Sequence, residues 1–371
     1  MKIAMFGHKR IPSREGGIEV VVEELASRMV DLGHEVTCFN RKGHHVSGKE
    51  FDIEAYDTYR GIKLESVCTI DKKGLAAISS SFLAACKAAR GNYDIVHIHA
   101  EGPAAMCWIP KLAGKKVIVT IHGLDWARAK WGALSSKYIK WGEKLAVKHA
   151  DEIIVLSKNT QEYFKKEYGR KTELIPNGIS RPEKREAAEI KKQWGLTKGS
   201  YVLFVGRIVP EKGLTYLIEA WKDIKTDKKL VITGGSSDTQ NYMNELKKIS
   251  PPNVIFTGFQ QGRVLEELYS NAYIYTLPSD LEGMPISLLE AMSYGNCCIV
   301  SDIPECLEVV EDKAVVFEKS NANDLKRTLE ELLDCPDTVQ KYCDRSAEFV
   351  LEKYAWSDVV DKMMSIYGLR C

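Results

Sequence analysis

Two carboxylates, Glu282 and Glu290, stand eight positions apart around a loop and the start of a predicted helix. Proline suits the first turn of a helix, so Pro285 predicts that the helix begins there. The backbone N–H groups of residues 286–288 would then be free to bind a phosphate, assisted by the helix dipole. The carboxylates can accept hydrogen bonds from hydroxyls on either side, which suits a sugar joined to a nucleotide. An ordinary capped surface helix is the alternative.

A pair of cations lies in a second segment, which runs from Gly206-Arg207 to Lys212-Gly213 between a predicted strand and a predicted helix. Arg207 offers a planar fork for a phosphate, and Lys212 offers a compact point charge. Together they can neutralise a diphosphate as it leaves. The alternative is an ordinary surface arginine and lysine, but the flanking glycines favour a phosphate site. The G-x-x-x-x-G-K-[ST] pattern of a Walker loop does not occur.

Gly16 and Gly17 precede another predicted helix and allow a phosphate or a sugar to approach the backbone closely. Two glycines alone are a weak signal, and the G-x-G-x-x-G pattern of a dinucleotide site is absent. His122 follows the predicted strand 116–121. It can donate a hydrogen bond to a sugar or orient an acceptor, although a structural histidine is the simpler interpretation.

Two further groups of residues raise the question of a metal. His97 and His99 are two positions apart on a predicted strand, so they point to the same face. A third ligand is not apparent, which favours a structural role for the pair. Asp280 and Glu282 are the nearest approximation to a D-x-D metal motif. The sequence therefore implies neither a divalent metal nor another cofactor.

The segment 128–148 combines cations with aromatic residues. Its apolar residues recur at spacings of three and four, which predicts one face of a helix beside a stripe of lysines. This pattern fits an interfacial helix near anionic lipid. The alternative is a set of core side chains beside a solvated lysine face. The apolar positions are Trp131, Leu134, Tyr138, Trp141 and Leu145, and the lysines are Lys137, Lys140, Lys144 and Lys148.

Length and charge limit the possible classes of protein. A chain of 371 residues exceeds one typical core, so two domains are expected. The net charge of +1 argues against a dedicated nucleic-acid binder. Residues 1–180 hold 28 Lys and Arg against 21 Asp and Glu, a net of +7, whereas residues 181–371 hold 24 against 30, a net of −6. The basic half is expected to meet an anionic partner, with a chance imbalance as the alternative.

Sequence features also bear on the cellular location. No apolar run reaches the roughly 20 residues that cross a bilayer, because the best candidate, 74–89, contains three serines and Lys87. The first seven residues are too short for a signal-peptide core. The ten cysteines lack C-x-x-C spacing, which favours free thiols in a reducing compartment. We therefore expect a cytoplasmic protein that acts at the inner face of the plasma membrane.

Short apolar runs alternate with helical periodicity along the chain, which predicts parallel α/β architecture. Ligands of such sheets bind outside the carboxyl ends of the strands, where all the motifs above are predicted to lie. A charged, proline-containing stretch divides the chain into a domain of residues 1–180, a linker of 181–198 and a domain of 199–354. The predicted strands are 2–6, 35–40, 94–99, 116–121, 152–156, 173–175, 201–205, 230–233, 254–257, 272–277 and 297–301.

Five motifs occur together in one order and span most of the chain. Together they resemble the retaining glycosyltransferases of family 4, including those of bacterial cell-surface polysaccharide synthesis. The resemblance implies the GT-B fold, in which two facing Rossmann-like, doubly wound domains enclose a cleft. The motifs are Gly16-Gly17-Ile-Glu19, Thr120-Ile-His122-Gly123, Ile175-Pro-Asn-Gly178, Gly206-Arg207 with Glu211-Lys212-Gly213, and Glu282 through Glu290.

The resemblance implies roles for both domains and for single residues. Residues 1–180 would bind the acceptor, residues 199–354 would bind the nucleotide-sugar donor, and the helix of about 355–371 would pack back onto the first domain. Arg207 and Lys212 would hold the diphosphate, Glu290 the ribose hydroxyls and Glu282 the transferred sugar, with His122 near the sugar. These residues apart from Glu290 form the implied catalytic set. The remaining implied donor-binding residues are Gly16, Gly17, Phe259 at the base, Gly283, Met284, Pro285 and Ile286.

The implied reaction moves a sugar, with retention of configuration, from a nucleoside-diphosphate sugar to a glycan or polyprenyl-linked glycan. Two alternatives remain open: a nucleotide-sugar epimerase of the same fold, and a non-catalytic nucleotide-sugar-binding protein. The loop after Gly283 reads Met-Pro-Ile-Ser, where many members carry an aromatic residue and a further glycine. The loop 301–306 also lacks the frequent double glycine. These departures bear on which sugar is moved, and not on the transfer itself.

Overall fold

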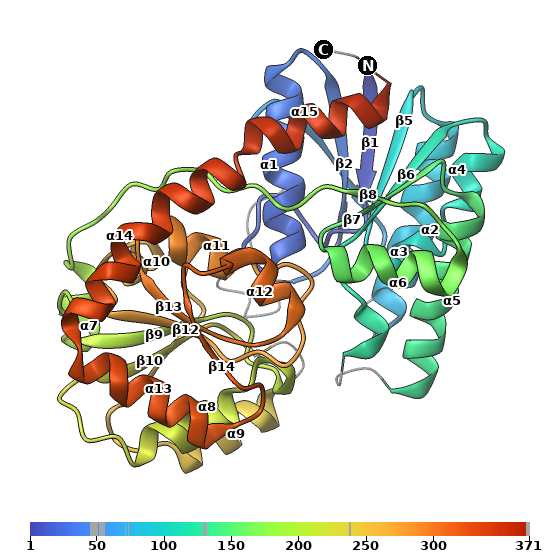
Figure 1. Cartoon of the computed structure of the whole chain (residues 1–371). Coiled ribbons are helices and arrows are strands. Elements are labelled where there is room, and N and C mark those ends of the chain that lie inside the picture. The colour runs from blue at the N-terminus through green and yellow to red at the C-terminus, as the bar shows by residue number, and fades with distance from the viewer. Residues whose placement is uncertain are drawn as a thin grey trace. The chain divides into compact units, whose positions relative to one another are not determined.

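The computed structural model describes residues 1–44, 51, 56–70, 72, 74–128, 132–236 and 239–368. The chain forms two units, each built around its own parallel sheet (Figure 1). The first unit contains Met1–Asn177 together with residues from Ser357 onward, and the second contains Gly178–Trp356. The α/β class predicted from the alternation of apolar runs and helical periodicity is confirmed.

The sheet of the first unit has the strand order β3-β4-β2-β1-β5-β6-β7-β8. Its pairs are parallel except for β3 with β4. This order reverses between β1 and β5, as in a doubly wound Rossmann sheet. The strands are β1 (Lys2–Phe6), β2 (Glu35–Arg41), β3 (Thr58–Tyr59), β4 (Ile62–Val67), β5 (Ile95–His99), β6 (Lys116–Ile121), β7 (Glu152–Val155) and β8 (Glu173–Leu174).

Helices cover both faces of this sheet. One face carries a buried cluster in which Ala84 and Ala88 of α2 and Ala146 of α5 pack against strand residues such as Val96 and Val119. Alanine side chains are small, so these helices lie close to the strands. The helices of the unit are α1 (Gly17–Asp31), α2 (Leu75–Arg90), α3 (Glu101–Ala104), α4 (Trp108–Leu112), the 3₁₀ turn η2 (Asp125–Ala127), α5 (Ala133–His149), α6 (Lys158–Tyr168) and α15 (Trp356–Tyr367).

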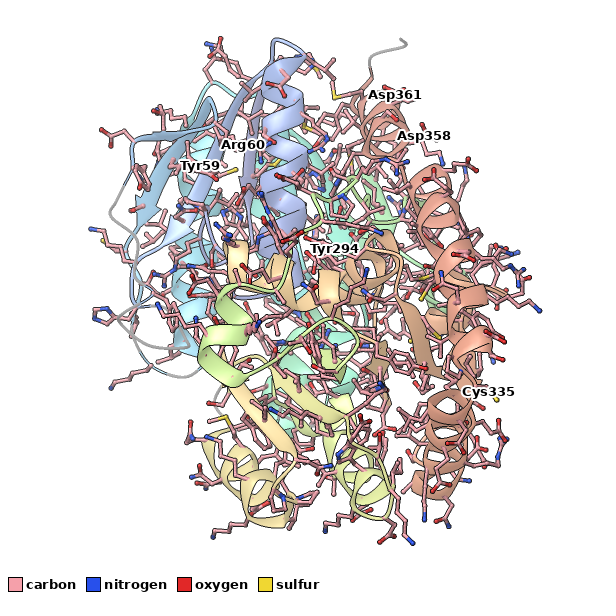
Figure 2. All side chains as sticks on the ribbon, turned by 90° about the vertical axis from the view of Figure 1, so that its left-hand side faces the viewer. Tyr59, Arg60, Tyr294, Cys335, Asp358 and Asp361 are labelled. Atoms are coloured by element: carbon pink, nitrogen blue, oxygen red, sulfur yellow. The ribbon has the colours of Figure 1, made fainter. Side chains whose placement is uncertain are left out.

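The last helix, α15, returns to the first unit after the chain has completed the second. Lys116 at the start of β6 donates from Nζ to the carbonyl oxygen of Ile366 at 2.7 Å. The hydroxyl of Tyr367 lies 2.7 Å from Nδ1 of His97, in the middle of the interior strand β5. The opposite side of the helix carries Asp358 and Asp361, which are exposed (Figure 2). Residues from the end of the chain therefore complete the packing of its first sheet.

The short β3–β4 hairpin was not predicted, and it is fixed to α1 by polar contacts. Nη1 of Arg60 lies 3.0 Å from the carboxylate of Glu24 and 3.4 Å from that of Glu23. The hydroxyl of Tyr59 donates to the same Glu23 at 3.3 Å. Figure 2 shows Tyr59 and Arg60 beside α1. These contacts hold an antiparallel edge onto an otherwise parallel sheet.

The second unit repeats the doubly wound plan with the strand order β11-β10-β9-β12-β13-β14, all parallel. Its strands are almost wholly apolar, as expected for a sheet covered on both faces. The strands are β9 (Tyr201–Val205), β10 (Lys229–Thr233), β11 (Val254–Gly258), β12 (Ile274–Leu277), β13 (Cys297–Ser301) and β14 (Val315–Phe317). The helices are α7 (Glu189–Trp194), η3 (Pro210–Lys212), α8 (Leu214–Lys222), α9 (Gln240–Ile249), α10 (Gly262–Asn271), α11 (Ile286–Ser293), α12 (Pro304–Val310), α13 (Ala322–Asp334) and α14 (Pro336–Lys353).

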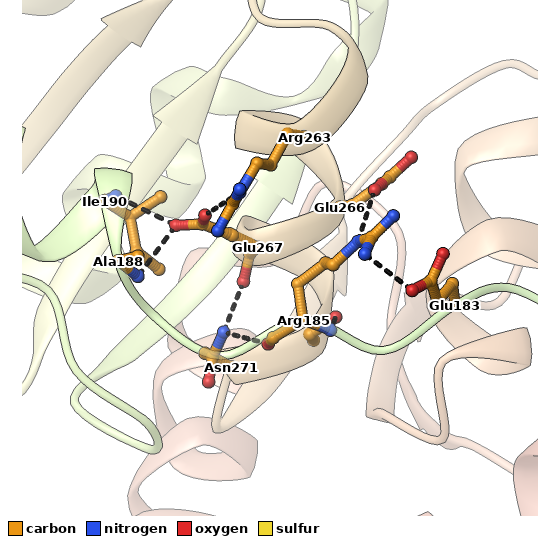
Figure 3. A network of polar contacts seen from close by, with 9 residues as sticks. Glu183, Arg185, Ala188, Ile190, Arg263, Glu266, Glu267 and Asn271 are labelled. Carbon is orange, nitrogen blue, oxygen red and sulfur yellow. Dashed lines mark hydrogen bonds and ion pairs between the residues drawn. The ribbon is translucent and has the colours of Figure 1, made fainter.

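The predicted linker 181–198 contains helix α7 and is fixed to α10 by a buried carboxylate. Oε2 of Glu267 accepts the backbone N–H groups of Ala188 at 3.0 Å and Ile190 at 3.1 Å. Arg263 donates to the other oxygen at 3.1 Å (Figure 3). Burial opposes ionisation of Glu267, but these hydrogen bonds outweigh it and lower the pKa of the carboxyl group. Glu267 therefore caps the first turn of α7 as an anion.

No helix in the described part of the chain is both long enough and apolar enough to span a bilayer.

Glu267→Ala is expected to lower the free energy of unfolding by about 2–4 kcal/mol, because two backbone N–H groups would lose their charged acceptor. Urea denaturation checks this. Glu266→Ala is the matched control, since Glu266 is half-exposed and pairs with Arg185 at 3.0 Å. That change is expected to cost under about 1 kcal/mol. Equal losses in the two variants would contradict the capping role.

Candidate functional site

The second sheet reverses its strand order between β9 and β12, which are hydrogen-bonded neighbours. From β9 the chain proceeds to β10 and β11 on one side, whereas β13 and β14 follow β12 on the other. Ligands of doubly wound sheets bind at such a point, outside the carboxyl ends of the strands. Both of the predicted donor segments lie here, because 206–213 follows β9 and 278–290 follows β12.

Backbone packing at this edge leaves room only for glycine at two positions. Gly234 has a φ of +145°, and a Cβ atom there would lie 1.8 Å from the carbonyl oxygen of Gly206. Gly213 has a φ of +69°, and its Cβ would lie 1.9 Å from the carbonyl oxygen of Pro278. The N–H of Gly206 also donates to the carbonyl of Thr233 at 3.0 Å. The loop after β9 is therefore packed directly against its neighbours.

Lys212 and Glu282 were predicted for the diphosphate and the sugar respectively, and the structure joins them in a buried ion pair. Nζ of Lys212 lies 2.5 Å from Oε1 of Glu282, and the hydroxyl of Ser279 donates to the same oxygen at 2.6 Å. Each member of the pair is 8% exposed. Removing one member of a buried ion pair leaves the other charge uncompensated. The two residues therefore act as one unit of the site.

The start of α11 differs from the prediction. The helix begins at Ile286, and Pro285 is its N-cap residue with extended backbone angles. The N–H of Leu288 donates to the carbonyl oxygen of Pro285 at 3.1 Å, so the prediction of a free N–H at Leu288 is wrong. The reason is a tightened first turn, which satisfies this group locally. No side chain caps the helix, so Ile286 and Ser287 carry the N–H groups that remain for a phosphate.

Glu290 lies one turn further along α11 and is oriented by Tyr269, which the sequence did not reveal. The hydroxyl of Tyr269 donates to Oε2 of Glu290 at 3.1 Å. Tyr269 is buried, which raises the pKa of its hydroxyl well above the ordinary value, and its ring stacks on that of Tyr294. The hydroxyl of Tyr275 lies 2.9 Å from Oγ of Ser287. Glu290 is half-buried and is thus held in a fixed rotamer.

Asp280, the first residue of the weak D-x-D motif, joins the two loops instead of facing Glu282. Its N–H donates to the carbonyl of Glu211 at 2.9 Å, and its carboxylate accepts the hydroxyls of Tyr216 at 2.6 Å and Ser320 at 2.7 Å. In the described residues, no group of three His, Cys, Asp or Glu side chains could hold a metal ion. Asp280 has a structural role.

The other predicted donor residues lie along the same edge of the sheet. Arg207 is the second residue after β9 and is half-buried. Gly283 and Met284 are buried in the turn before α11. Phe259 directly follows β11, two strands away from β9. The assignment of these residues to diphosphate, sugar and base remains a prediction.

The first unit has a strand-order reversal of its own, between β1 and β5. Gly7 has a φ of +112°, and a Cβ there would lie 2.0 Å from the carbonyl oxygen of His99. Gly16 is the N-cap residue of α1, and Gly17 is the first residue of the helix. A Cβ at Gly16 would lie 2.9 Å from the carboxylate of Glu19. Gly16 has no side chain to cap this helix, but the carboxylate of Glu19 in the first turn accepts the N–H of its own residue and, at 2.9 Å, that of Lys9.

Three histidines of the first unit, on β5 and directly after β6, form two separate groups of hydrogen bonds. Nδ1 of His97 lies 2.7 Å from the hydroxyl of Tyr367, and its Nε2 lies 2.7 Å from Oγ1 of Thr120. Nδ1 of His99 lies 3.0 Å from Nε2 of His122. His97 therefore uses both ring nitrogens in bonds to hydroxyls, which agrees with the structural role favoured for it. His122 receives a fixed orientation from His99.

Two buried glutamates that the sequence did not single out hold the loop after His122. Oε2 of Glu101 accepts the N–H of Asp125 at 2.8 Å, and Oε2 of Glu143 accepts the indole N–H of Trp126 at 3.2 Å. Both glutamates are 0% exposed. Burial first, then the charges of Asp125 and Glu143, raise the pKa of Glu101 to about 10. Glu101 is therefore a neutral acid at physiological pH.

Lys140, predicted to face solvent in the lysine stripe, lies in an aromatic cage instead. Its Nζ is 3.0 Å from Oε1 of Glu143 and lies over the rings of Trp126 and Tyr163, at 4.5 and 4.6 Å from their centroids. The hydroxyl of Tyr163 donates to Glu143 at 2.9 Å. The prediction that Lys140 belongs to the exposed lysine stripe is wrong. Its ammonium turns inward because Glu143, one turn along on α5, is a buried carboxylate that requires a cation beside it.

Two family profiles match the chain. The profile described as "Glycosyltransferase Family 4" matches residues 15–181, and the one described as "Glycosyl transferases group 1" matches residues 186–349. Together they cover most of the chain.

Curated proteins with related sequences are also glycosyltransferases. An uncharacterised glycosyltransferase of Methanocaldococcus jannaschii is 25% identical over 100% of this chain and 98% of its own. The UDP-Gal:alpha-D-GlcNAc-diphosphoundecaprenol alpha-1,3-galactosyltransferase of Escherichia coli is 32% identical over 57% of this chain and 58% of its own.

Solved structures share the fold. Sucrose-phosphate synthase from Thermosynechococcus elongatus has a TM-score of 0.81 at 20% identity, covering 99% of this chain and 98% of that one. Anabaena HepE in complex with UDP-glucose has a TM-score of 0.81 at 17% identity, covering 99% of both chains. At these identities the likeness establishes the fold alone, and that fold is GT-B.

These buried histidines predict acid sensitivity. Desolvation lowers the pKa of His97 to about 3 and that of His122 to about 4, against an ordinary 6.5. Between the lowered pKa of each histidine and its ordinary value of 6.5, the unfolded chain binds more protons than the folded one. The free energy of unfolding therefore falls as the pH drops below about 6.5. His97→Gln removes one such site, and we expect a shallower slope, by up to about 1.4 kcal/mol per pH unit.

Urea denaturation at a series of pH values measures these slopes. His44→Gln is the control, because His44 is exposed. Parallel curves for wild type and His97→Gln would contradict the prediction.

Proposed function

Because the chain belongs to glycosyltransferase family 4, we propose that it is a retaining enzyme that moves a sugar from a nucleoside-diphosphate sugar to a glycan or polyprenyl-linked glycan. The ion pair of Lys212 and Glu282 carries this proposal. It places a fixed, dry cation and a carboxylate at the strand-order reversal of the second sheet, where such folds bind ligands. The group transferred is proposed to be a hexose or a related sugar.

Rupture of the anomeric bond leaves negative charge on the departing diphosphate. The ammonium of Lys212 has three N–H donors, and Glu282 takes one of them, so Lys212 can bind a phosphate oxygen while it stays paired. Arg207 adds a guanidinium fork, and the N-terminus of α11 adds the N–H groups of Ile286 and Ser287. Preorganised donors of this kind stabilise charge as it develops. We propose that they act without a divalent metal.

The two carboxylates, Glu290 and Glu282, are proposed to bind different parts of the donor. Tyr269 holds Glu290 in one orientation, which suits a bidentate acceptor for the two ribose hydroxyls. Glu282, with the buried turn Gly283-Met284-Pro285, is proposed to bind the transferred sugar, and Phe259 is proposed to line the base. Ser279 and Lys212 restrain the carboxylate of Glu282, so a sugar can donate hydrogen bonds to it in few orientations.

The first unit is proposed to bind the acceptor. Gly16 and Gly17 place no side chain of their own at the N-terminus of α1, where a ligand is proposed to approach, and His122 directly follows β6. The low pKa of His122 keeps its ring neutral at physiological pH, so the ring can accept a hydrogen bond from a hydroxyl or donate one to it. The name of the E. coli relative includes a diphosphoundecaprenol acceptor, which supports a lipid-linked acceptor. We propose that the enzyme works at the cytoplasmic face of the membrane.

Arg207→Ala is expected to lower kcat by about 10²–10³-fold, because one fixed donor to the leaving group is lost. Glu282→Ala is expected to abolish measurable transfer, since it also releases Lys212. Release of nucleoside diphosphate in the presence of acceptor measures both. Lys222→Ala, an exposed lysine at the end of α8, serves as the control and should behave as wild type. Full activity of the Arg207 and Glu282 variants would refute the site.

The donor is tested by thermal unfolding with uridine, thymidine, guanosine and adenosine diphosphate sugars. A ligand that binds only the folded state raises the melting temperature. One base is expected to give a clear shift, and Glu290→Ala should reduce it. A flat response to every donor would count against the proposal. A product sugar that remains on the nucleotide would identify an epimerase, and binding without turnover under any acceptor would identify a sensor.

A further inference from the structure

Helices α2, α4 and α5 form one outer surface of the first unit. Their inner sides share a single buried cluster, to which α2 contributes Ala84 and Ala88, the turn before α4 contributes Cys107, and α5 contributes Ala146. Helix α4 packs against both α2 and α5. Figure 1 shows the three helices on the side of the sheet that faces away from α1. Their outer sides therefore face the same way, and we call them the α2–α4–α5 surface.

The outer side of α5 is a mixture of apolar and cationic side chains. Leu134 is 84% exposed and Trp141 is 49% exposed. Lys137, Lys144 and Lys148 are exposed as well. The five positions recur every three or four residues, so they share one face of the helix. The sequence predicted an apolar face beside a separate lysine stripe, and the structure places Leu134 and Trp141 among the lysines instead. Trp131 lies outside the described residues.

The neighbouring helices extend this apolar exposure. Helix α4 exposes Trp108 by 37% and Leu112 by 78%, and α2 exposes Phe82 by 46% and Leu83 by 37%. These are large side chains on adjacent helices, unlike the single exposed residues that normally need no explanation. Several large exposed apolar side chains on helices that pack together mark a surface that meets a partner or a membrane.

The charge of this surface has one sign. Among α2, α4 and α5 the described residues include a single carboxylate, Glu143, and it is wholly buried. Lys87 and Lys111 pair with acids of neighbouring strands and turns, Glu65 and Asp151. Across the described part of the chain, no carboxylate lies within ion-pair distance of the α5 lysines named above. Exposed cations without partners are therefore interleaved with exposed Leu and Trp side chains.

We infer that the α2–α4–α5 surface docks this enzyme onto the surface of an anionic lipid bilayer. Leu112, Leu134 and Trp141 would enter the boundary between headgroups and acyl chains, and the α5 lysines would meet lipid phosphates. Tryptophan favours this interfacial zone because its ring is apolar and its N–H is polar. The purpose of docking, access to a lipid-linked acceptor, rests on the proposed function; the docking itself does not.

A second copy of the chain fits this surface less well. A closed dimer would bring the same patch of each subunit together. Lysine would then face lysine without an intervening acid, because α5 exposes no carboxylate. A bilayer rich in phosphate supplies both the missing negative charge and the apolar layer.

Co-sedimentation with vesicles tests the inference on the full chain. One set of vesicles contains phosphatidylcholine alone, and the other contains equal parts of phosphatidylcholine and phosphatidylglycerol. The protein is expected to sediment with the anionic vesicles only. Each lysine removed should weaken binding about five-fold, so the triple variant Lys137→Gln, Lys144→Gln, Lys148→Gln should bind about 100-fold more weakly. Leu134→Ser should cost about ten-fold.

The matched control is the triple variant Lys191→Gln, Lys192→Gln, Lys198→Gln, which removes the same charge from exposed positions of the second unit. It should bind vesicles as wild type does. All variants change exposed side chains, and their unchanged thermal unfolding would show that they fold.

The outcomes separate this inference from the proposed function. Vesicle binding without any transfer to a soluble acceptor analogue would leave docking intact and contradict the transferase proposal. Transfer without binding to either kind of vesicle would overturn docking alone. A dimer that Leu134→Ser dissociates would assign the surface to a second copy. If the two triple-lysine variants weakened vesicle binding equally, net charge alone would explain the binding. That result would overturn the role of this surface.

Discussion

Close packing of backbone against backbone at the reversal of strand order is the constraint on which both units depend. In the first sheet a Cβ atom at Gly7 would collide with the carbonyl oxygen of His99, and in the second a Cβ at Gly213 would collide with that of Pro278. In both cases the glycine lies in the loop after one strand, and the oxygen belongs to a residue at or directly after the end of the adjacent strand. The loops that carry chemistry can start side by side only because no side chain separates them.

The sequence predicted the parts of the fold that arise from buried, uninterrupted apolar runs. Strands such as Lys2–Phe6, Lys116–Ile121, Tyr201–Val205 and Cys297–Ser301 have the predicted bounds, since both faces of a parallel strand are covered and the whole run is apolar. Strand β4 was missed because it reads Ile-Lys-Leu-Glu-Ser-Val, in which buried and exposed residues are mixed without an uninterrupted apolar run. Its neighbours, and not its composition, make it a strand.

The candidate site was predicted as a set of positions but not as a set of contacts. Glycines and charged residues at strand ends are visible in the sequence, whereas the pairing of Lys212 with Glu282 joins residues 70 positions apart. The supporting tyrosines, Tyr269 and Tyr275, look like ordinary core residues in the sequence because their rings are apolar and buried. Helical periodicity also could not decide which side of α5 faces inward. Lys140 has a long apolar stem, and only Glu143 and the cage of aromatic rings show that its charge belongs inside.

The return of α15 to the first sheet has a consequence for how the protein is made. His97 and Lys116 bind Tyr367 and Ile366, so the first sheet waits for residues that the ribosome adds after the entire second unit. Domains usually fold in the order of their synthesis, the N-terminal one first. Here the unit that is begun first can be finished only last, and until then His97 and Lys116 lack the hydrogen bonds that α15 supplies. The first sheet therefore reaches its final packing only after the second unit has been synthesised.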